Sequence, residues 1–391
     1  MRNGSGLTRR EWLSRSVGAA ALSGQVLRSA PSAPVSPVAI AKCPTYDEDL
    51  VARLGKMFDQ IGGMGKLVSG KTVTIKLNLT GSPSNRYPGY SPNVTHWVHP
   101  KLVGATCHLL GRAGAKRIRL VESCGRPLDV FEDFIMDAGW DVKAIQTAAP
   151  LVEFENTNTL GKGKRYSRLK VPHGGYIFPA FDLNHSYEDT DVFMSMSKLK
   201  NHANAGITLS IKNCFGTTPT AVYGDDSGVD EPNEKPRGGR GSVLHQGKRQ
   251  PPKSAPQELS TTTPRQDGYR LPRIIVDIIA ARPIDLNIID GIESAVGGEG
   301  PWIRGSKYTH PGVLVVGRNP VCTDSVATAV MGYDPQATRD QIPFVNCDNT
   351  MKLAEAVGLG SADLKKIEVV GVPIRDAVYD FESRWKGNTP A

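Results

Sequence analysis

Three neighbouring segments decide the fold: KTVTIKLNL (71–79), HPKLVGATCHLLGRAGA (99–115) and KRIRLVES (116–123). The first and third alternate apolar and polar residues and are rich in β-branched side chains, a pattern typical of strands. The middle segment has the spacing of an amphipathic helix that begins at Pro100 and ends near Gly114. A strand, a helix and a strand in this order predict two parallel strands joined by a right-handed crossover.

The same alternation continues along the chain. A second helix is predicted over 128–140 and a third strand over 141–147. Later strands are predicted over 189–197, 283–290, 310–318 and 364–371. We therefore predict an α/β fold of three layers, with helices on both faces of a mostly parallel sheet. A chain of 391 residues can bury one large core of this kind or two modest ones.

Residues 224–268 interrupt this pattern with Gly, Pro, Arg, Lys, Gln and Thr. So few apolar side chains cannot offset the entropy lost on ordering, so we predict a flexible, disordered polar insertion over one face. The α/β core would then consist of a first part, 42–223, and a second part, 269–391.

The N-terminus carries Arg9 and Arg10 ahead of a weakly apolar run that is too short to span a bilayer. The pair resembles a twin-arginine export signal, although Trp12 replaces the usual Phe. We predict a signal segment over 1–41, cleaved after Ala41 and recognised by the twin-arginine machinery, with a periplasmic or extracellular mature protein. A basic disordered tail is the alternative.

Composition narrows the class of partner. The net charge is +8, but Lys and Arg are spread along the chain and interleaved with acids, so no nucleic acid is expected and small anions are favoured. None of the six cysteines forms a C-x-x-C pair, so the chain lacks the local spacing of an iron–sulfur cluster or a zinc ribbon.

Charged residues gather where predicted strands end, the edge at which parallel sheets bind ligands. Lys76 and Asn78 end one strand, and SKLKNHANAGITLSIKNCFG (197–216) follows another. Each has a plainer interpretation: Lys76 can snorkel at a sheet edge, His202 can be a core histidine, and Asp290 can cap a turn. Because several of these charged residues fall at the ends of predicted strands, we favour a ligand-binding site over these separate structural roles.

That stretch, together with IIDGIESAVGGEGP (288–301) and HPGVLVVGRNPVCTDSVATAVMGYDP (310–335), resembles the motifs of the domain of unknown function 362 family. The resemblance runs from Lys71 to Pro335 and implies the architecture more than the reaction. Many members look exported or linked to iron–sulfur proteins, and some carry a ferredoxin segment of clustered cysteines, which this chain lacks. His202, Gly206, Thr208 and Lys212 are also similar to the stretch in nickel-pincer lactate racemases where a lysine holds the cofactor.

Several lysines at one strand end repel one another unless a bound anion or a protein carboxylate neutralises them. The leading hypothesis is therefore an exported enzyme acting on a small carboxylate or phosphate by proton abstraction, as a lyase or isomerase does, or by redox chemistry. Its predicted residues are Lys212, His202 and Lys200 for catalysis; Lys76, Asn78, Lys198, Thr208 and Asn213 for substrate; and Asp290, Glu299 and Asp324 for a divalent metal.

Lys212 is the cation predicted to matter most, because an apolar wall around it would lower its pKa, while the alternative is a structural pair with Asp290 or Asp324. Oxygen ligands would favour magnesium, calcium or manganese. Two other classes stay open: a non-catalytic anion- or metal-binding protein, and a redox protein with a partner-supplied iron–sulfur or nickel cofactor.

Overall fold

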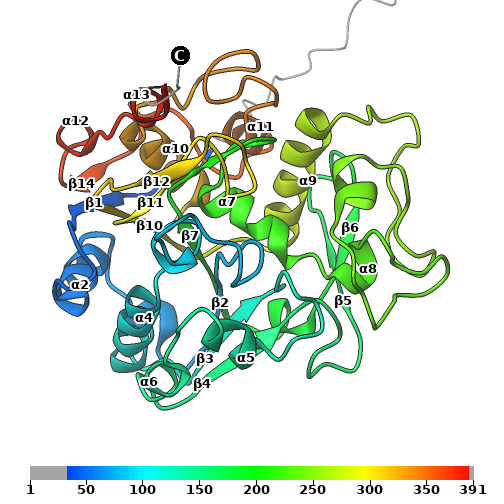
Figure 1. The fold of residues 1–391 in the computed structure, drawn as a ribbon, viewed down its shortest axis with the longest axis horizontal. Helices are drawn as coiled ribbons and strands as arrows, with labels where there is room; N and C mark the ends of the chain where they lie inside the picture. The colour runs from blue at the N-terminus through cyan, green and yellow to red at the C-terminus, as the bar shows by residue number, and fades with distance from the viewer. Residues whose placement is uncertain (1–32, 387–391) are drawn as a thin grey trace, which may run out of the picture. The chain divides into compact units, whose positions relative to one another are not determined.

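An eight-stranded sheet lies at the centre of the molecule in the order β14-β1-β13-β10-β7-β2-β3-β4 (Figure 1). The computed structural model describes residues 33–386. The strands are β1 (Val38–Lys42), β2 (Thr72–Lys76), β3 (Arg117–Glu122), β4 (Val152–Asn156), β7 (Val192–Lys198), β10 (Leu286–Gly291), β13 (Val313–Gly317) and β14 (Val369–Gly371). Only β13 runs antiparallel to its neighbours among these strands, so the predicted mostly parallel sheet is confirmed.

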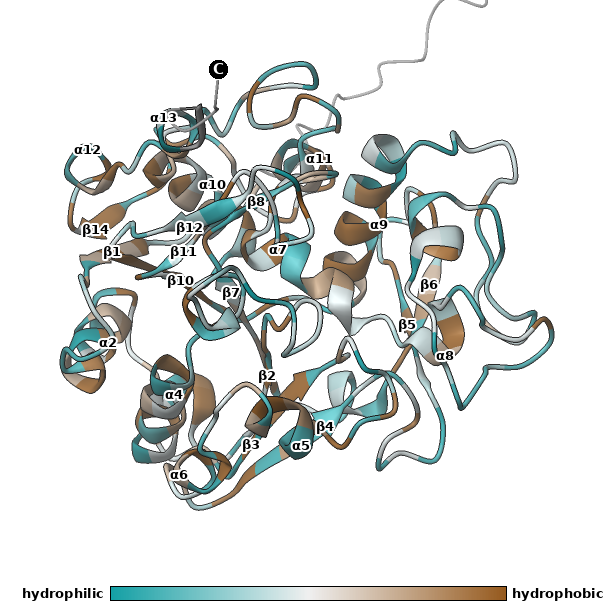
Figure 2. Cartoon of the chain, in the orientation of Figure 1, coloured by the Kyte–Doolittle hydropathy of each residue, from teal (hydrophilic) through white to brown (hydrophobic). Residues whose placement is uncertain are grey.

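Helices cover both faces of this sheet. One face packs on α2 (Leu50–Gln60), α4 (Pro100–Arg112), α5 (Phe131–Met136) and α6 (Val142–Gln146), and the other on α7 (Leu209–Asn213), α9 (Asp267–Ala281), α10 (Pro320–Val330) and α11 (Thr350–Ala356). Successive residues of β13 alternate between the two cores: Val313 and Val315 lie in one, Leu314 and Val316 in the other. Figure 2 shows the matching hydrophobic colouring along α9.

Shorter elements complete the described chain. They are α3 (Gly65–Val68), α8 (Thr220–Tyr223), α12 (Ile374–Ala377), α13 (Phe381–Lys386) and three strand pairs: β5 (Ser167–Lys170) with β6 (Ala180–Leu183), β8 (Asn201–His202) with β9 (Gly206–Ile207), and β11 (Ser294–Val296) with β12 (Lys307–Thr309). No helix of the described chain is long and apolar enough to cross a membrane.

The strand order creates a crevice between β2 and β7. From β2 the chain moves outward to β3 and β4, then returns to place β7 on the other side of β2. At such a switch point the connections leave two adjacent strands in opposite directions, and ligands of α/β sheets bind there, beyond the carboxyl ends. The topology therefore predicts a ligand site near the ends of these two strands, whose last residues are Lys76 and Lys198.

Two predicted elements need correction. The strand expected over 141–147 is the helix α6, because the Asp141 side chain accepts a hydrogen bond from Ala144 N at 2.9 Å and caps it. The proposed signal segment 1–41 overlaps β1, whose Val38 and Ile40 are buried and pair with β13. Cleavage after Ala41 would remove most of that strand. The twin-arginine residues themselves lie outside the described residues.

The segment 224–268 is irregular, as its composition predicts, but it is packed rather than detached. Val243 and Leu244, in the single turn η4 (Gly241–His245), are buried in the core beside α9. Glu258 forms an ion pair with the buried Arg270 of α9 at 2.6 Å. Composition alone could not foresee these contacts, because they depend on a few apolar side chains and one buried ion pair.

Candidate functional site

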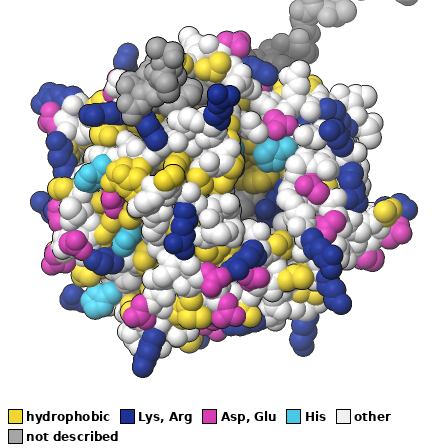
Figure 3. Space-filling view, viewed as in Figure 1, with side chains coloured by type: hydrophobic (Ala, Val, Ile, Leu, Met, Phe, Trp, Pro, Cys, Tyr) yellow, Lys and Arg dark blue, Asp and Glu magenta, His cyan; other side chains and the backbone are white. Residues whose placement is uncertain are grey.

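A cavity of about 370 Å³ opens at the switch point. It lies beyond the ends of β2 and β3 and beside α7, and Figure 3 shows a hollow over this region with His and Lys or Arg side chains at its edge. The cavity brings together seven of the predicted residues: Lys76, Asn78, His202, Thr208, Lys212, Asn213 and Glu299. It also contains Glu122, Ser123, Arg237, Arg240 and His245, which sequence reasoning missed.

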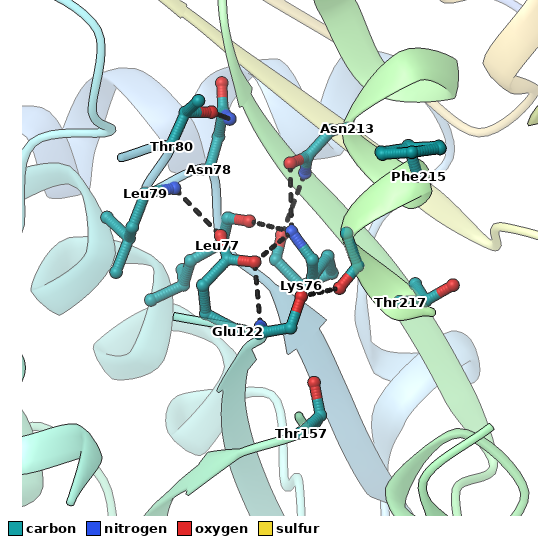
Figure 4. A network of polar contacts seen from close by, with 12 residues as sticks. Lys76, Leu77, Asn78, Leu79, Thr80, Glu122, Thr157, Asn213, Phe215 and Thr217 are labelled. Atoms are coloured by element: carbon teal, nitrogen blue, oxygen red, sulfur yellow. Dashed lines mark hydrogen bonds and ion pairs between the residues drawn. The ribbon is translucent and has the colours of Figure 1, made fainter. Parts of the chain in front are cut away.

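Lys76 forms the floor of the cavity and is neutralised within the protein (Figure 4). Its ammonium forms an ion pair with Glu122 at 2.6 Å and donates to Leu77 O at 2.7 Å and Asn213 Oδ1 at 3.2 Å. Gly216 fits beside it because a Cβ at that position would lie 2.8 Å from Lys76 Nζ. With this charge already balanced, Lys76 is better suited to holding the site together than to binding an anion.

Asn213 and Asn78 also bind the protein itself. The Asn213 amide donates to Lys76 O, Ser195 Oγ and Met196 O, and so ties α7 to β2 and β7. Asn78 Oδ1 accepts from Lys198 N at 3.2 Å. Both asparagines line the cavity, but their contacts position its walls.

Lys212 differs from these residues because its ammonium makes no hydrogen bond or ion pair with any residue that the structure describes. It lies 4.7 Å from the centre of the Phe215 ring and lines the cavity. Burial lowers its pKa to about 8, although the Glu299 charge acts in the opposite direction. The alternative pairing with Asp290 or Asp324 does not occur, since both carboxylates have other partners.

Asp324 instead holds the start of the short helix that carries Lys212. Its carboxylate accepts from Ser210 N at 2.9 Å and from Ile211 N at 2.8 Å. The preceding residue, Leu209, has φ of 42°, a conformation that a branched side chain adopts only when its surroundings impose it. Burial raises the pKa of Asp324 to about 7 despite these two donors.

Two neutral donors lie beside Lys212. The Thr208 hydroxyl is buried, lines the cavity and makes no hydrogen bond within the described chain. The His202 pKa is held well below its usual value by burial and by the Lys212 charge, so the ring is neutral. Asn204 N donates to His202 Nδ1 at 3.2 Å, which assigns the ring hydrogen to Nε2.

Glu299 closes the same end of the cavity. Its carboxylate accepts from Ala203 N at 2.9 Å and from the Trp302 indole at 3.2 Å, and lies 3.8 Å from His202 Nδ1. These bonds fix the carboxylate at this end of the cavity. It is the carboxylate best placed to interact with that ammonium across the cavity.

Arg240 faces the cavity from the segment 224–268. Its Nε donates to Thr218 O at 2.7 Å, and its Nη2 donates to Ser123 Oγ at 2.5 Å and Asn158 Oδ1 at 3.3 Å. Burial lowers its pKa to about 10, so the guanidinium stays charged at neutral pH. The composition of this segment predicts a flexible insertion, so no sequence signal indicates that Arg240 lines a site. Glu122, the last residue of β3, could have been found by the rule that identified Lys76.

Lys198 and Lys200, by contrast, lie outside the cavity. Lys198 is fully buried, pairs with Asp290 at 3.0 Å and donates to the Tyr46 hydroxyl at 2.8 Å. Lys200 donates to His96 O at 2.9 Å and Glu299 O at 3.0 Å, and burial lowers its pKa to about 7. The structure therefore does not bring the Lys198 and Lys200 amines to the cavity that the other predicted residues line, and both amines are bound by acceptors of the protein itself.

The structure does not bring the three predicted metal ligands together. Asp290, Glu299 and Asp324 were predicted as one set of ligands, but each is engaged separately, by Lys198, by Ala203 N and by the start of α7. Across the part of the chain that the structure describes, no group of three or more His, Cys, Asp or Glu side chains could hold a metal ion. The sequence could not reveal that Asp290 in β10, Glu299 in the loop after β11 and Asp324 in α10 lie in different surroundings.

The chain is similar to one protein family and to two known proteins. The family described as "Domain of unknown function (DUF362)" matches residues 73–329. The thylakoid-associated protein sll1697 of Synechocystis is 25% identical over 307 residues, which cover 77% of this chain and 76% of that protein. The lactate racemase apoprotein of Thermoanaerobacterium thermosaccharolyticum is similar at 12% identity and a TM-score of 0.34, over 70% of this chain and 54% of that chain.

Proposed function

The chain belongs to the DUF362 family, and from that premise we propose that it is an enzyme that binds a small organic anion in the switch-point cavity and uses Lys212 as a proton acceptor. One observation carries the proposal: Lys212 lies at the cavity with no hydrogen bond or ion pair to a described residue. A lysine that only stabilised the fold would be expected to have a partner of the kind that Lys76 and Lys198 have.

The charges of the cavity favour an anion. The cations Lys76, Lys212, Arg237 and Arg240 line it, against the carboxylates Glu122 and Glu299. Because Lys76 and Glu122 neutralise each other, the remaining charge is positive. Partly buried positive charge without a counter-ion, as at Lys212 and Arg240, is unfavourable, so a bound anion would stabilise the cavity.

The proposed reaction is removal of a proton from carbon next to a carbonyl group. The neutral Lys212 amine takes the proton: the C–H bond breaks, an N–H bond forms, and the electron pair moves to the carbonyl oxygen as an enolate. The unpartnered Thr208 hydroxyl and the Nε2 hydrogen of His202 are the donors available for that oxygen. Return of a proton from Lys212 to carbon completes an isomerisation, and loss of a leaving group from the neighbouring carbon completes an elimination.

The proposal is tested by hydrogen exchange in D₂O. Small oxo acids such as pyruvate and 2-oxobutanoate are incubated with the protein, and replacement of carbon-bound hydrogen by deuterium is followed by proton NMR. Wild-type protein should accelerate exchange of at least one compound, and Lys212→Met should return it to the background rate while remaining folded. Binding of these acids without accelerated exchange would contradict the enzyme and assign the chain to the non-catalytic anion-binding class.

We propose in addition that the protein is exported through the twin-arginine route. The support is the Arg9-Arg10 pair ahead of a weakly apolar run, both of which lie outside the described residues. Replacing both arginines by lysine should leave the precursor in the cytoplasm, while Arg2→Lys should not. Fractionation and immunoblotting measure where the protein is found. Normal export of the variant with both arginines replaced would refute this route.

A further inference from the structure

Arg240 reaches the cavity on a turn that is fixed by two neighbouring aspartates. The Asp226 carboxylate accepts from Arg237 N at 2.8 Å and Gly238 N at 3.2 Å, and Asp225 N donates to Gly239 O at 2.7 Å. These bonds hold the turn 237–240 against the cavity. The segment that interrupts the core therefore supplies one wall of the site.

The hydrogen-bond partners of Arg240 are all uncharged. Its Nε and Nη2 are occupied by Thr218, Ser123 and Asn158, and its Nη1 makes no hydrogen bond with a described residue. No described carboxylate lies within ion-pair distance of it. The guanidinium is thus held rigidly while its charge and one nitrogen stay available, which is the arrangement that binds an anion well.

Arg240 and Lys212 share one aromatic neighbour. The Arg240 guanidinium lies 6.0 Å, and Lys212 Nζ 4.7 Å, from the centre of the Phe215 ring. One small molecule can therefore reach both groups. A base must be neutral to accept a proton, so the permanently charged arginine is the better anchor and Lys212 the better base.

We infer that Arg240 binds the carboxylate of the substrate, and that the substrate is a small oxo monocarboxylate. This inference rests on the proposed function, since it assigns the anchor of the molecule whose proton Lys212 removes. In the state in which Lys212 is neutral and can accept a proton, the charge balance favours a single negative charge: Lys76 is paired with Glu122, the charges of Glu299 and the exposed Arg237 sum to zero, and the charge of Arg240 is left. A phosphate or a dicarboxylate would bring a second negative charge next to Glu122 and Glu299.

Calorimetric titration tests this assignment with pyruvate as the monocarboxylate, 2-oxoglutarate as the dicarboxylate and dihydroxyacetone phosphate as the phosphate. Wild-type protein should bind pyruvate more tightly than the other two. Arg240→Met should weaken pyruvate binding by at least about 30-fold, the smaller loss expected when one partner of a buried charge pair is removed. Lys253→Met removes a charge from the surface of the same segment and should leave binding unchanged.

A second measurement uses only the wild-type protein, so it does not depend on whether a variant folds. Pyruvate binding to the wild type is compared at about pH 7 and about pH 9, between which Lys212 loses its proton and Arg240 does not. Retained affinity at the higher pH supports Arg240 as the anchor. An affinity for pyruvate that falls as Lys212 loses its proton would overturn the assignment of Arg240 as the anchor. So would an Arg240→Met variant that folds and binds pyruvate as tightly as the wild type.

The outcomes separate this inference from the proposed function. Lys212-dependent exchange in D₂O together with tighter binding of 2-oxoglutarate or the phosphate would overturn the monocarboxylate assignment and leave the proton-transfer function standing. Absence of both binding and exchange for every oxo acid tested would overturn the proposed function and the inference with it.

Discussion

Lys198 and Lys212 come from the same short stretch of sequence, yet they lie in opposite electrostatic surroundings. Lys198 is fully buried among Asp290, the Tyr46 hydroxyl and Asn93 O, so each of its hydrogens has an acceptor. Lys212 lies against the face of Phe215, lines the cavity and makes no hydrogen bond or ion pair with a described residue. The same residue type thus stabilises the end of β7 at position 198, while at position 212 its charge has no acceptor within the described chain.

The difference shows which observation separates a structural lysine from a functional one. Burial alone does not mark a functional lysine, because Lys198, Lys200 and Lys76 are buried and bind the protein itself, whereas Lys212 is only partly buried. The number of hydrogen-bond acceptors around the ammonium separates them, because an ammonium without acceptors lowers the stability of the fold unless a bound ligand supplies them. Substitutions at Lys198, Asp324 and Lys212 test this difference.

The largest effect is expected at Lys198. Lys198→Met would leave the Asp290 carboxylate buried without its cation, and the free energy of unfolding should fall by about 3–5 kcal/mol, the range for breaking a buried pair from one side. Urea denaturation followed by circular dichroism measures it. The double variant Lys198→Met, Asp290→Asn should recover part of the loss. A single variant as stable as the wild type would show that Lys198 is not the structural member of the comparison.

A smaller effect, and one that depends on pH, is expected at Asp324. Its folded pKa is about 7, above the value of an unfolded aspartate, so its ionisation disfavours folding. The contribution of Asp324 to stability should therefore be greatest below about pH 4 and decline toward pH 7 as the carboxylate ionises, by about 2–4 kcal/mol at most. Asp324→Asn should flatten this part of the pH profile in thermal denaturation. An unchanged profile would mean that another group titrates there.

The smallest effect is expected at Lys212, and its sign is opposite to that at Lys198. Its folded pKa, about 8, lies below that of an unfolded lysine, so the cost of burying the charge is fully present below pH 8 and fades as pH rises toward about 10.4. Lys212→Met should raise the melting temperature by about 2–4 °C at neutral pH, as about 1 kcal/mol would in a large domain. The gain should shrink near pH 10. A lowered melting temperature would give Lys212 a structural role.

Sequence patterns were sufficient for the architecture because the strands of a parallel sheet are marked by continuous β-branched runs such as that of β2. They also placed Lys212, Thr208 and His202 at one strand end. They could not separate Lys198 from Lys212, since the acceptors Asp290 and Tyr46 are 92 and 152 residues away along the chain. Nor could they find Arg240, whose position depends on hydrogen bonds to Asp225 and Asp226 within a segment of low apolar content.

The central claim, that Lys212 acts as a base, is tested most directly by Lys212→Arg. Arginine keeps the positive charge and roughly the length of the side chain, but it stays protonated at every accessible pH. With pyruvate in D₂O, the wild-type exchange rate should rise with pH and level off above about pH 8, where the Lys212 amine is neutral. Lys212→Arg should still bind pyruvate and show background exchange at every pH. Wild-type exchange by this variant would contradict the account.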